Sequence, residues 1–308
     1  MALSSRTQAW MAAVLTVLIW TFFIIVARAS AAHSLLPLDI GFLRMVGAGC
    51  VLIPWGWWLQ RQRAPAQGSL AGLSPLPWSL TAGAGLFGSL LYATLAYSGF
   101  FYAPAAHASV LMPGSLPLWT TLLAWWWLKE PLTRLRVMGL ACIVCGDALV
   151  GGLSLLKAFE GGDIWKGDLL FMSAAACWAV YTVMVRRHGL DAVQATVAIT
   201  AFSCVSYVPL YALAAWQGWV PSHLGQAPWG EMAFQAVYQG IGSVVISGIT
   251  FNIMVRHYGP VRSTMMTALV PGLSALGAVV LLGEPMGWNL LAGLALVTCG
   301  ILFGVRRN

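Results

Sequence analysis

Apolar residues occur along this chain in ten long runs, separated by short stretches that hold most of its charged side chains. Each run approaches the ~20 residues that an α-helix needs to cross the hydrocarbon core of a membrane. We therefore predict ten membrane-spanning helices in an all-α protein. Their expected bounds are 9–29, 38–59, 78–98, 103–128, 133–153, 167–187, 192–216, 231–254, 260–282 and 286–305.

A set of proline, glutamate and glycine positions occurs twice along the chain. Pro117, Glu130, Pro131, Gly139 and Gly146 recur 154 positions later as Pro271, Glu284, Pro285, Gly293 and Gly300. More loosely, Trp20 with Arg28 is matched by Trp178 with Arg186. Five spans per copy is an odd number, so the second copy must cross the membrane in the opposite direction. The sequence predicts a single membrane domain, 1–308, with two inverted five-helix repeats (9–153 and 167–305) around a central cavity. An external linker is expected at 154–166.

Composition and charge agree with a lipid environment. Hydrophobic residues make up 59% of the chain and charged residues 8%, against about 25% charged in a soluble domain. The net charge of +7 comes from basic residues in short loops, twelve on one side of the predicted membrane and three on the other. This bias predicts cytoplasmic N- and C-termini. The expected partners are the lipid bilayer and a small-molecule substrate, not nucleic acid; the sequence leaves the oligomeric state open.

Three tryptophans differ in depth from the rest. Most of the 16 Trp fall at predicted span ends, where interfacial rings gather. Trp20, Trp119 and Trp178 fall near the middle of spans one, four and six, and Tyr181 follows Trp178 by one turn. A mid-membrane indole N–H needs a partner. We predict that these rings line a cavity for flat or apolar substrates; packing between helices is the alternative.

Prolines interrupt two spans at matching places. Pro113 and Pro117 lie in span four and Pro271 lies in span nine. A proline inside a helix frees a carbonyl one turn earlier, which in lipid must meet a neighbouring helix or water. We predict hinges or substrate-facing carbonyls at these sites, with ordinary packing kinks as the alternative.

Polar side chains within the spans are candidates for binding the polar end of a substrate. These are Tyr92, His107, Gln239 and Ser243. The last two begin a stripe at three- and four-residue spacing along span eight, so one face of that helix is polar. A polar stripe in a membrane helix turns toward protein or water. Hydrogen bonds between helices are the alternative interpretation.

Two charged residues near span ends are assigned to the surface. Arg44 is expected to snorkel to the outer surface, and a clamp for a substrate carboxylate is its alternative role. Asp147 is expected to reach water. Neither is included among the predicted site residues.

Several segments resemble a known family. AAHASVLMPGSLPLWTTLLAWWWLKEPL, followed by GLACIVCGDALVGG, resembles the paired signature of the ten-helix drug/metabolite transporters of the EamA type. VLIWTFFIIVARAS in the first span and TALVPGLSALGAVVLLGEPMGWNLLAGLALVTCG in the second copy are similar to it as well. The Trp-rich helices and HASVLMPG most resemble the YddG aromatic amino-acid exporters of bacterial inner membranes. This resemblance implies a basket of helices around a central cavity, with spans five and ten outside it.

The predicted function is export of aromatic and other apolar amino acids across a bacterial inner membrane, by alternating access around a midplane cavity. Export of other metabolites or cationic drugs is an alternative within the same fold, and a polytopic membrane enzyme or scaffold is an alternative of another class. The chain has no phosphate-binding loop, zinc-protease motif or nucleophile elbow. Cys142 and Cys145 have metal-like spacing, but they lack a second ligand pair. We expect no enzyme activity, cofactor or metal.

Overall fold

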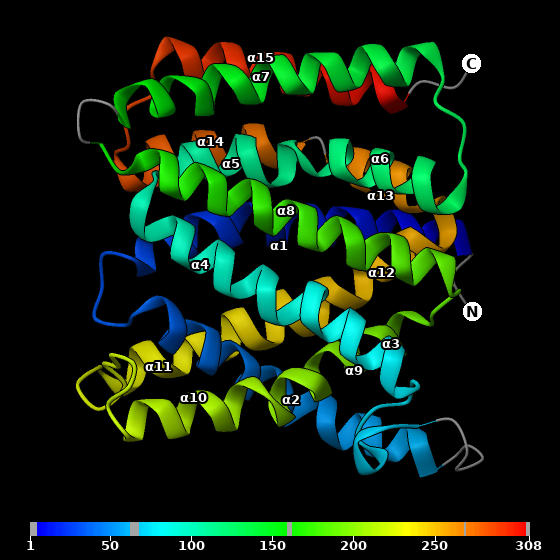
Figure 1. The fold of residues 1–308 in the computed structure, drawn as a ribbon, viewed down its shortest axis with the longest axis vertical. Helices are drawn as coiled ribbons and strands as arrows, with labels where there is room; N and C mark the ends of the chain where they lie inside the picture. The colour runs from blue at the N-terminus through cyan, green and yellow to red at the C-terminus, as the bar shows by residue number, and fades with distance from the viewer. Residues whose placement is uncertain (1–4, 62–67, 159–161, 268, 306–308) are drawn as a thin grey trace.

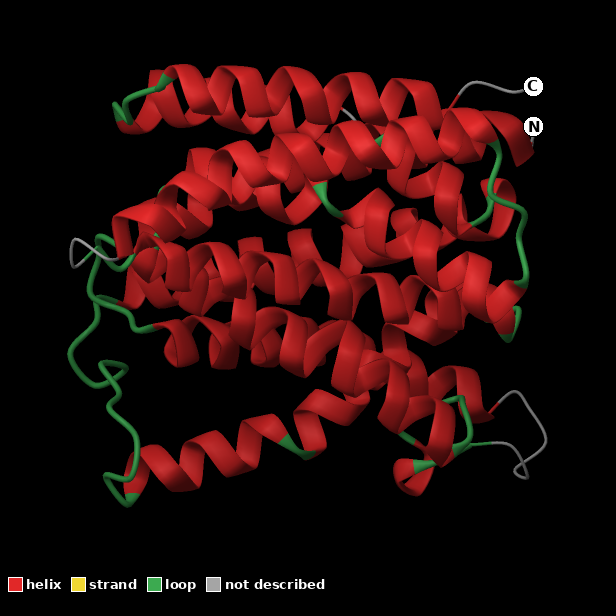
Figure 2. Ribbon diagram, turned by 45° about the horizontal axis from the view of Figure 1, so that its top comes forward, coloured by secondary structure: helices red, strands yellow, loops and turns green. Residues whose placement is uncertain are grey.

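The computed structural model describes residues 5–61, 68–158, 162–267 and 269–305, which are helical apart from short connections. No strand occurs in these ranges (Figure 2). In chain order the segments are α1 (Ser5–Ser30), α2 (Pro37–Arg61), η2 (Leu70–Gly72), α3 (Trp78–Gly85), η3 (Leu86–Leu91), α4 (Tyr92–Tyr102), α5 (Ala105–Ser109), η4 (Val110–Gly114), α6 (Leu116–Leu128), α7 (Arg134–Ala158), α8 (Ile164–Arg187), α9 (Ala192–Val205), α10 (Tyr207–Trp216), α11 (Trp229–Gln235), η5 (Ala236–Ile246), α12 (Ser247–Tyr258), α13 (Pro260–Met266), α14 (Leu269–Leu282) and α15 (Trp288–Val305).

These segments build the predicted spans. Within the described ranges, eight helical stretches are long and apolar enough to cross a membrane, and α15 contains a shorter apolar helix. The remaining predicted span, the fourth, is made of α5, η4 and α6. The largest difference in bounds is at α7, which continues to Ala158 into the predicted linker; α1, α4 and α12 each extend four residues beyond a predicted end.

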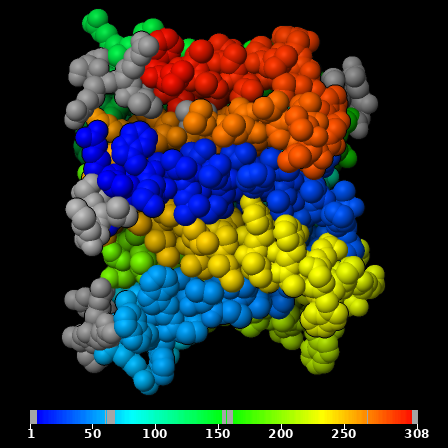
Figure 3. Space-filling view, turned by 180° about the vertical axis from the view of Figure 1, so that it is seen from behind, coloured from blue at the N-terminus to red at the C-terminus, as the bar shows by residue number. Residues whose placement is uncertain are grey.

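The helices lie side by side, with the connections at two ends of the molecule (Figure 1). The first residue of α1 and the last residue of α15 lie at the same end (Figure 1). We name this end the terminal face and the other end the opposite face. Seen from behind, α1 lies on the surface between α14 and the η5–α12 segment (Figure 3). Trp10, Val14, Leu18 and Phe22 of α1 are exposed at four-residue spacing, which gives this helix an apolar strip suited to lipid.

Helices α7 and α15, spans five and ten, pack against each other at one edge of the molecule (Figure 1). Glycines bring their backbones together: a Cβ on Gly146 would lie 2.7 Å from the Gly293 carbonyl oxygen, and one on Gly300 would lie 2.5 Å from that of Gly139. Gly139 and Gly293 are repeat equivalents, and so are Gly146 and Gly300. Equivalent residues that meet in crossed pairs indicate antiparallel helices related by a local twofold axis, as inverted repeats require.

Irregular helix occurs at matching places in the two halves. Span three contains the π-helical segment η3, and span eight contains the π-helical segment η5. Span four combines the π-helical segment η4 with a turn at Ser115, and span nine breaks at Thr267. Pro117 and Pro271 lie in the first turns of α6 and α14, where a missing N–H is tolerated. The interruptions predicted in spans four and nine are therefore present.

Candidate functional site

A narrow cavity lies between helices of both halves. It is lined by Trp20, Phe23, Ile24, Tyr92, Met112, Pro113, Leu116, Ala175, Trp178 and Val270. These side chains come from α1, α4, η4, α6, α8 and α14. Its lining side chains leave it narrow, with about 320 Å³ between them when space open to solvent is included. We name it the central cavity.

Trp178 is the centre of a cluster of aromatic rings at this cavity. Its ring centroid lies 5.9 Å from that of Trp20, 4.8 Å from that of Tyr92, 5.2 Å from that of Tyr181 and 5.7 Å from that of Phe251. The Trp20 indole N–H donates to Ser247 Oγ at 3.3 Å. The buried Trp178 Nε1 has no hydrogen-bond partner among the described residues. The wall is therefore aromatic, and one of its rings carries a buried indole N–H without a partner among the described residues.

Some of the predicted site residues meet at the central cavity. Trp20, Tyr92 and Trp178 line it, as does the predicted hinge Pro113. Tyr181 is fully buried behind Trp178, and its hydroxyl accepts a 2.7 Å hydrogen bond from Asn252 Nδ2. Tyr181 thus packs against a lining residue without lining the cavity itself.

Two other predicted residues lie elsewhere. Trp119 lines a second cavity, between α6, α7 and α8, together with Asp147 and Asp168. His107 Nδ1 lies 2.9 Å from Asp168 Oδ1, within hydrogen-bond distance, and both side chains are largely buried. The structure thus places Trp119 at a cavity between α6, α7 and α8. Neither residue lines the central cavity.

The position of Asp147 differs from the expected one. It was expected to reach water, but only 5% of the residue is exposed, and neither carboxylate oxygen has a hydrogen-bond partner within the described ranges. Its position near the end of a span suggested contact with solvent. The helices packed around α7 instead enclose it beside the second cavity.

Gln239 and Ser243 form a buried polar cluster with Arg44 and Tyr97, which we name the Arg44 cluster. Arg44 Nη1 donates to Ser243 Oγ at 2.9 Å, to Tyr97 Oη at 3.3 Å and to the Gln239 carbonyl oxygen at 3.4 Å. Tyr97 in turn donates to Gln239 Oε1 at 2.9 Å. Arg44 is only 4% exposed, so the prediction that it snorkels to the surface was wrong. Acceptors on other helices hold it inside.

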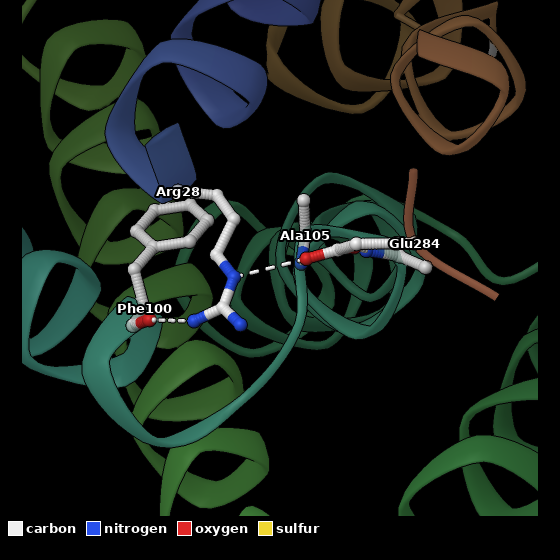
Figure 4. A network of polar contacts seen from close by, with 5 residues as sticks. Arg28, Phe100, Ala105 and Glu284 are labelled. Carbon is white, nitrogen blue, oxygen red and sulfur yellow. Dashed lines mark hydrogen bonds and ion pairs between the residues drawn. The ribbon is translucent and has the colours of Figure 1, made fainter. Parts of the chain in front are cut away.

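An ion-pair network connects helix ends at the opposite face (Figure 4). Arg28 Nε lies 2.9 Å from Glu284 Oε1, and Arg28 Nη1 donates to the Phe100 carbonyl oxygen at 2.7 Å. The Glu284 carboxylate also accepts from the backbone N–H groups of Ala105 and Ala106, at 3.2 and 3.3 Å, at the start of α5. Sequence analysis marked Arg28 and Glu284 as repeated residues but missed this pairing. It joins the end of α1, the end of α4, the start of α5 and the α14–α15 connection.

The repeat-equivalent residues on the terminal face are arranged differently. Glu130 and Arg186 line an open polar cleft of about 450 Å³, together with Arg136, Tyr258 and residues at the start of α13. Glu130 pairs with Arg136 at 3.6 Å, and Arg186 donates to the Arg256 carbonyl oxygen at 3.4 Å. The two faces of the molecule therefore differ at corresponding positions.

Comparisons with known proteins identify the family. The sequence model of the EamA-like transporter family matches residues 8–152 and again residues 165–306. The chain belongs to the EamA-like transporter family. It is 25% identical to the uncharacterized transporter YyaM of Bacillus subtilis (strain 168) over 221 residues, 71% of this chain and 70% of YyaM. It is 24% identical to the uncharacterized transporter YoaV of the same organism over 290 residues, 90% of this chain and 89% of YoaV.

A solved crystal structure covers 96% of both chains at 24% identity with a TM-score of 0.65, which shows a shared fold. This member of the EamA-like family is thus a multi-pass membrane transporter with a ten-helix fold.

Proposed function

We propose that the protein is a secondary transporter that exports amino acids, mainly aromatic and other apolar ones, by alternating access across a bacterial inner membrane with both termini in the cytoplasm. The observation that supports this function best is the central cavity, whose aromatic wall is shared by spans of both repeats. Ring faces stack on flat side chains and exclude water from them. A cavity between repeats is where secondary transporters bind their substrates.

Each predicted residue has a distinct role in this proposal. Trp20, Tyr92 and Trp178 would contact the apolar side chain of the substrate, and Tyr181 would hold Trp178 in place. Gln239 and Ser243 would serve its polar end through the Arg44 cluster. His107 and Trp119 would have no contact with a substrate in the central cavity, because they lie near Asp168 at the second cavity.

The interrupted spans supply the motion in this proposal. The breaks beside Pro113, Pro117 and Pro271 would let the two parts of spans four and nine bend relative to each other. Pro113 and Val270 line the central cavity, so bending at these breaks would change its walls. Access could then alternate between the two faces without unfolding a span.

Cationic drugs are the competing cargo within the same fold. The side chains that line the central cavity include no Asp or Glu in the part of the chain that the structure describes, so a permanent cation there would have ring faces as partners but no counter-charge. An enzyme or scaffold is a weaker alternative, since both compared relatives carry the name of transporters.

The test is counterflow of radiolabelled tryptophan into proteoliposomes of the purified protein, with leucine, threonine and a quaternary amine as competitors. We expect accumulation above empty liposomes and stronger competition by leucine than by threonine. Folded protein that accumulates no tryptophan would refute the amino-acid assignment, and competition by the quaternary amine alone would favour drug export.

A further inference from the structure

The interior of the Arg44 cluster holds a positive charge with neutral neighbours. Arg44 is 4% exposed, two turns into α2, and donates to a hydroxyl, a phenol and a backbone carbonyl. Removing a guanidinium from water is costly unless an anion or a full set of hydrogen bonds replaces the water. Such a residue within a membrane span needs a compensating partner.

No acidic side chain in the described ranges forms an ion pair with Arg44. The buried Asp39 on the same helix accepts from Tyr211, Ser222 and the His223 backbone N–H instead. Two donors of the cluster are unused: Arg44 Nε and Gln239 Nε2 are buried without a hydrogen-bond partner. A buried cation beside two unsatisfied donors is the chemistry that receives a carboxylate.

The cluster is separated from the central cavity by one side chain. Phe23 lines the cavity, and its ring lies 5.7 Å from the guanidinium carbon of Arg44 and 5.9 Å from the ring of Tyr97. A molecule with its apolar part against Trp20 would therefore need only a shift of Phe23 to bring a charged end to Arg44.

We propose that Arg44 binds the carboxylate of the transported substrate, with the Gln239 amide as a second donor and Phe23 as the movable cover. The substrate class is then a carboxylate that carries an apolar group, and the corresponding amide is a poor ligand. This proposal rests on the proposed function in taking the central cavity as the substrate site. It goes beyond that function in naming the group at the polar end, a carboxylate, and Arg44 as the residue that receives it.

The decisive variant is Gln239→Glu, which places a carboxylate beside Arg44 with almost no change in shape. An internal carboxylate would satisfy the arginine and preserve folding while it occupies the site. Arg44→Lys, which keeps a positive charge, and Arg61→Gln, at the exposed end of the same helix where its guanidinium lies over Trp57, complete the set.

Binding is measured as the rise in unfolding temperature of the detergent-purified protein, followed by light scattering. The ligands are two pairs that differ only at the acid group: phenylalanine with phenylalaninamide, and 3-phenylpropionate with 3-phenylpropionamide. In the unaltered protein and in Arg61→Gln, we expect each acid to bind about ten- to a hundredfold more tightly than its amide, as for loss of hydrogen bonds to a charged group. Gln239→Glu should abolish this preference and keep amide binding, and Arg44→Lys should retain part of it.

Equal binding of acid and amide by the unaltered protein, or an undiminished preference in Gln239→Glu, would overturn the proposal. Loss of all four ligands in a folded Gln239→Glu protein would also overturn it, because it would show a structural role. The proposed function can fail independently of this proposal. If the protein shows no tryptophan counterflow but still prefers 3-phenylpropionate to its amide, only the amino-acid assignment is refuted. If tryptophan counterflow occurs and is inhibited equally by the acids and their amides, only the proposed role of Arg44 is refuted.

Discussion

Glu284 ties three separate segments together at the opposite face, so neutralising it should weaken the fold measurably. Its carboxylate accepts from Arg28 Nε at 2.9 Å and from the N–H groups of Ala105 and Ala106 at 3.2 and 3.3 Å (Figure 4). In Glu284→Gln one oxygen becomes an NH₂ group, so at least one of these donors faces another donor. The side chain of Glu284 is only 11% exposed, whereas that of Arg28 is 33% exposed.

The expected loss of unfolding free energy in Glu284→Gln follows from these hydrogen bonds and from the exposure of Arg28. A hydrogen bond to a charged group contributes about 1.5–3 kcal/mol, and solvent around Arg28 reduces the ion-pair part. We expect Glu284→Gln to lower the free energy of unfolding by about 2 kcal/mol. The repeat equivalent is a matched control: Glu130 pairs with Arg136 at 3.6 Å, with both side chains partly exposed. Glu130→Gln should cost less than about 1 kcal/mol.

The assay is unfolding by SDS in mixed micelles, followed by tryptophan fluorescence, for both variants and for the unaltered protein. The double variant Arg28→Gln/Glu284→Gln measures the coupling between the two residues. Equal losses of stability in Glu284→Gln and Glu130→Gln would refute the argument. So would fully additive effects of the Arg28 and Glu284 substitutions.

Two further predictions concern the cavity wall and the helix pair at the edge. Trp178→Phe keeps a ring but removes the unused indole N–H. We expect tryptophan counterflow to fall about tenfold while the yield of folded protein stays unchanged. The control is Trp126→Phe at an exposed ring; the same fall in that variant would contradict a local effect at the cavity. Gly300→Ala places a Cβ 2.5 Å from the Gly139 carbonyl oxygen, so its unfolding free energy should drop by about 1–3 kcal/mol. Gly272→Ala, with open space around it, should cost far less, and equal losses would refute the packing argument.

The fold was largely predictable because the bilayer imposes strong requirements on sequence. A span must be apolar, helical and about 20 residues long, so the apolar runs located the helices to within a few residues at most ends. Pro117 and Pro271 located the interruptions in spans four and nine, since proline cannot continue the backbone hydrogen bonding. The crossed packing of Gly146 with Gly293 agrees with the inverted repeat.

The site was only partly predictable because sequence position gives the depth of a residue but not its neighbours. Trp20, Trp119 and Trp178 were all assigned a similar depth, but Trp20 and Trp178 line the central cavity and Trp119 lines the second cavity. Arg44 was assigned to the surface because it lies near a span end. Its partner Ser243 is 199 positions away, and no local pattern reveals such a contact.

The closed junction at Glu284 and the open cleft at Glu130 have an energetic consequence. A transporter that cycles needs two states of similar free energy, and a duplicated junction provides this because one copy can form as the other separates. Here the copies are unequal: Ala106 donates to Glu284, but the residue 154 positions later is Pro260, which has no N–H. If the terminal face closes in the same way, it lacks one hydrogen bond worth about 1.5–3 kcal/mol. The sequence itself would then set the resting population of the cycle, in favour of the state closed at the opposite face.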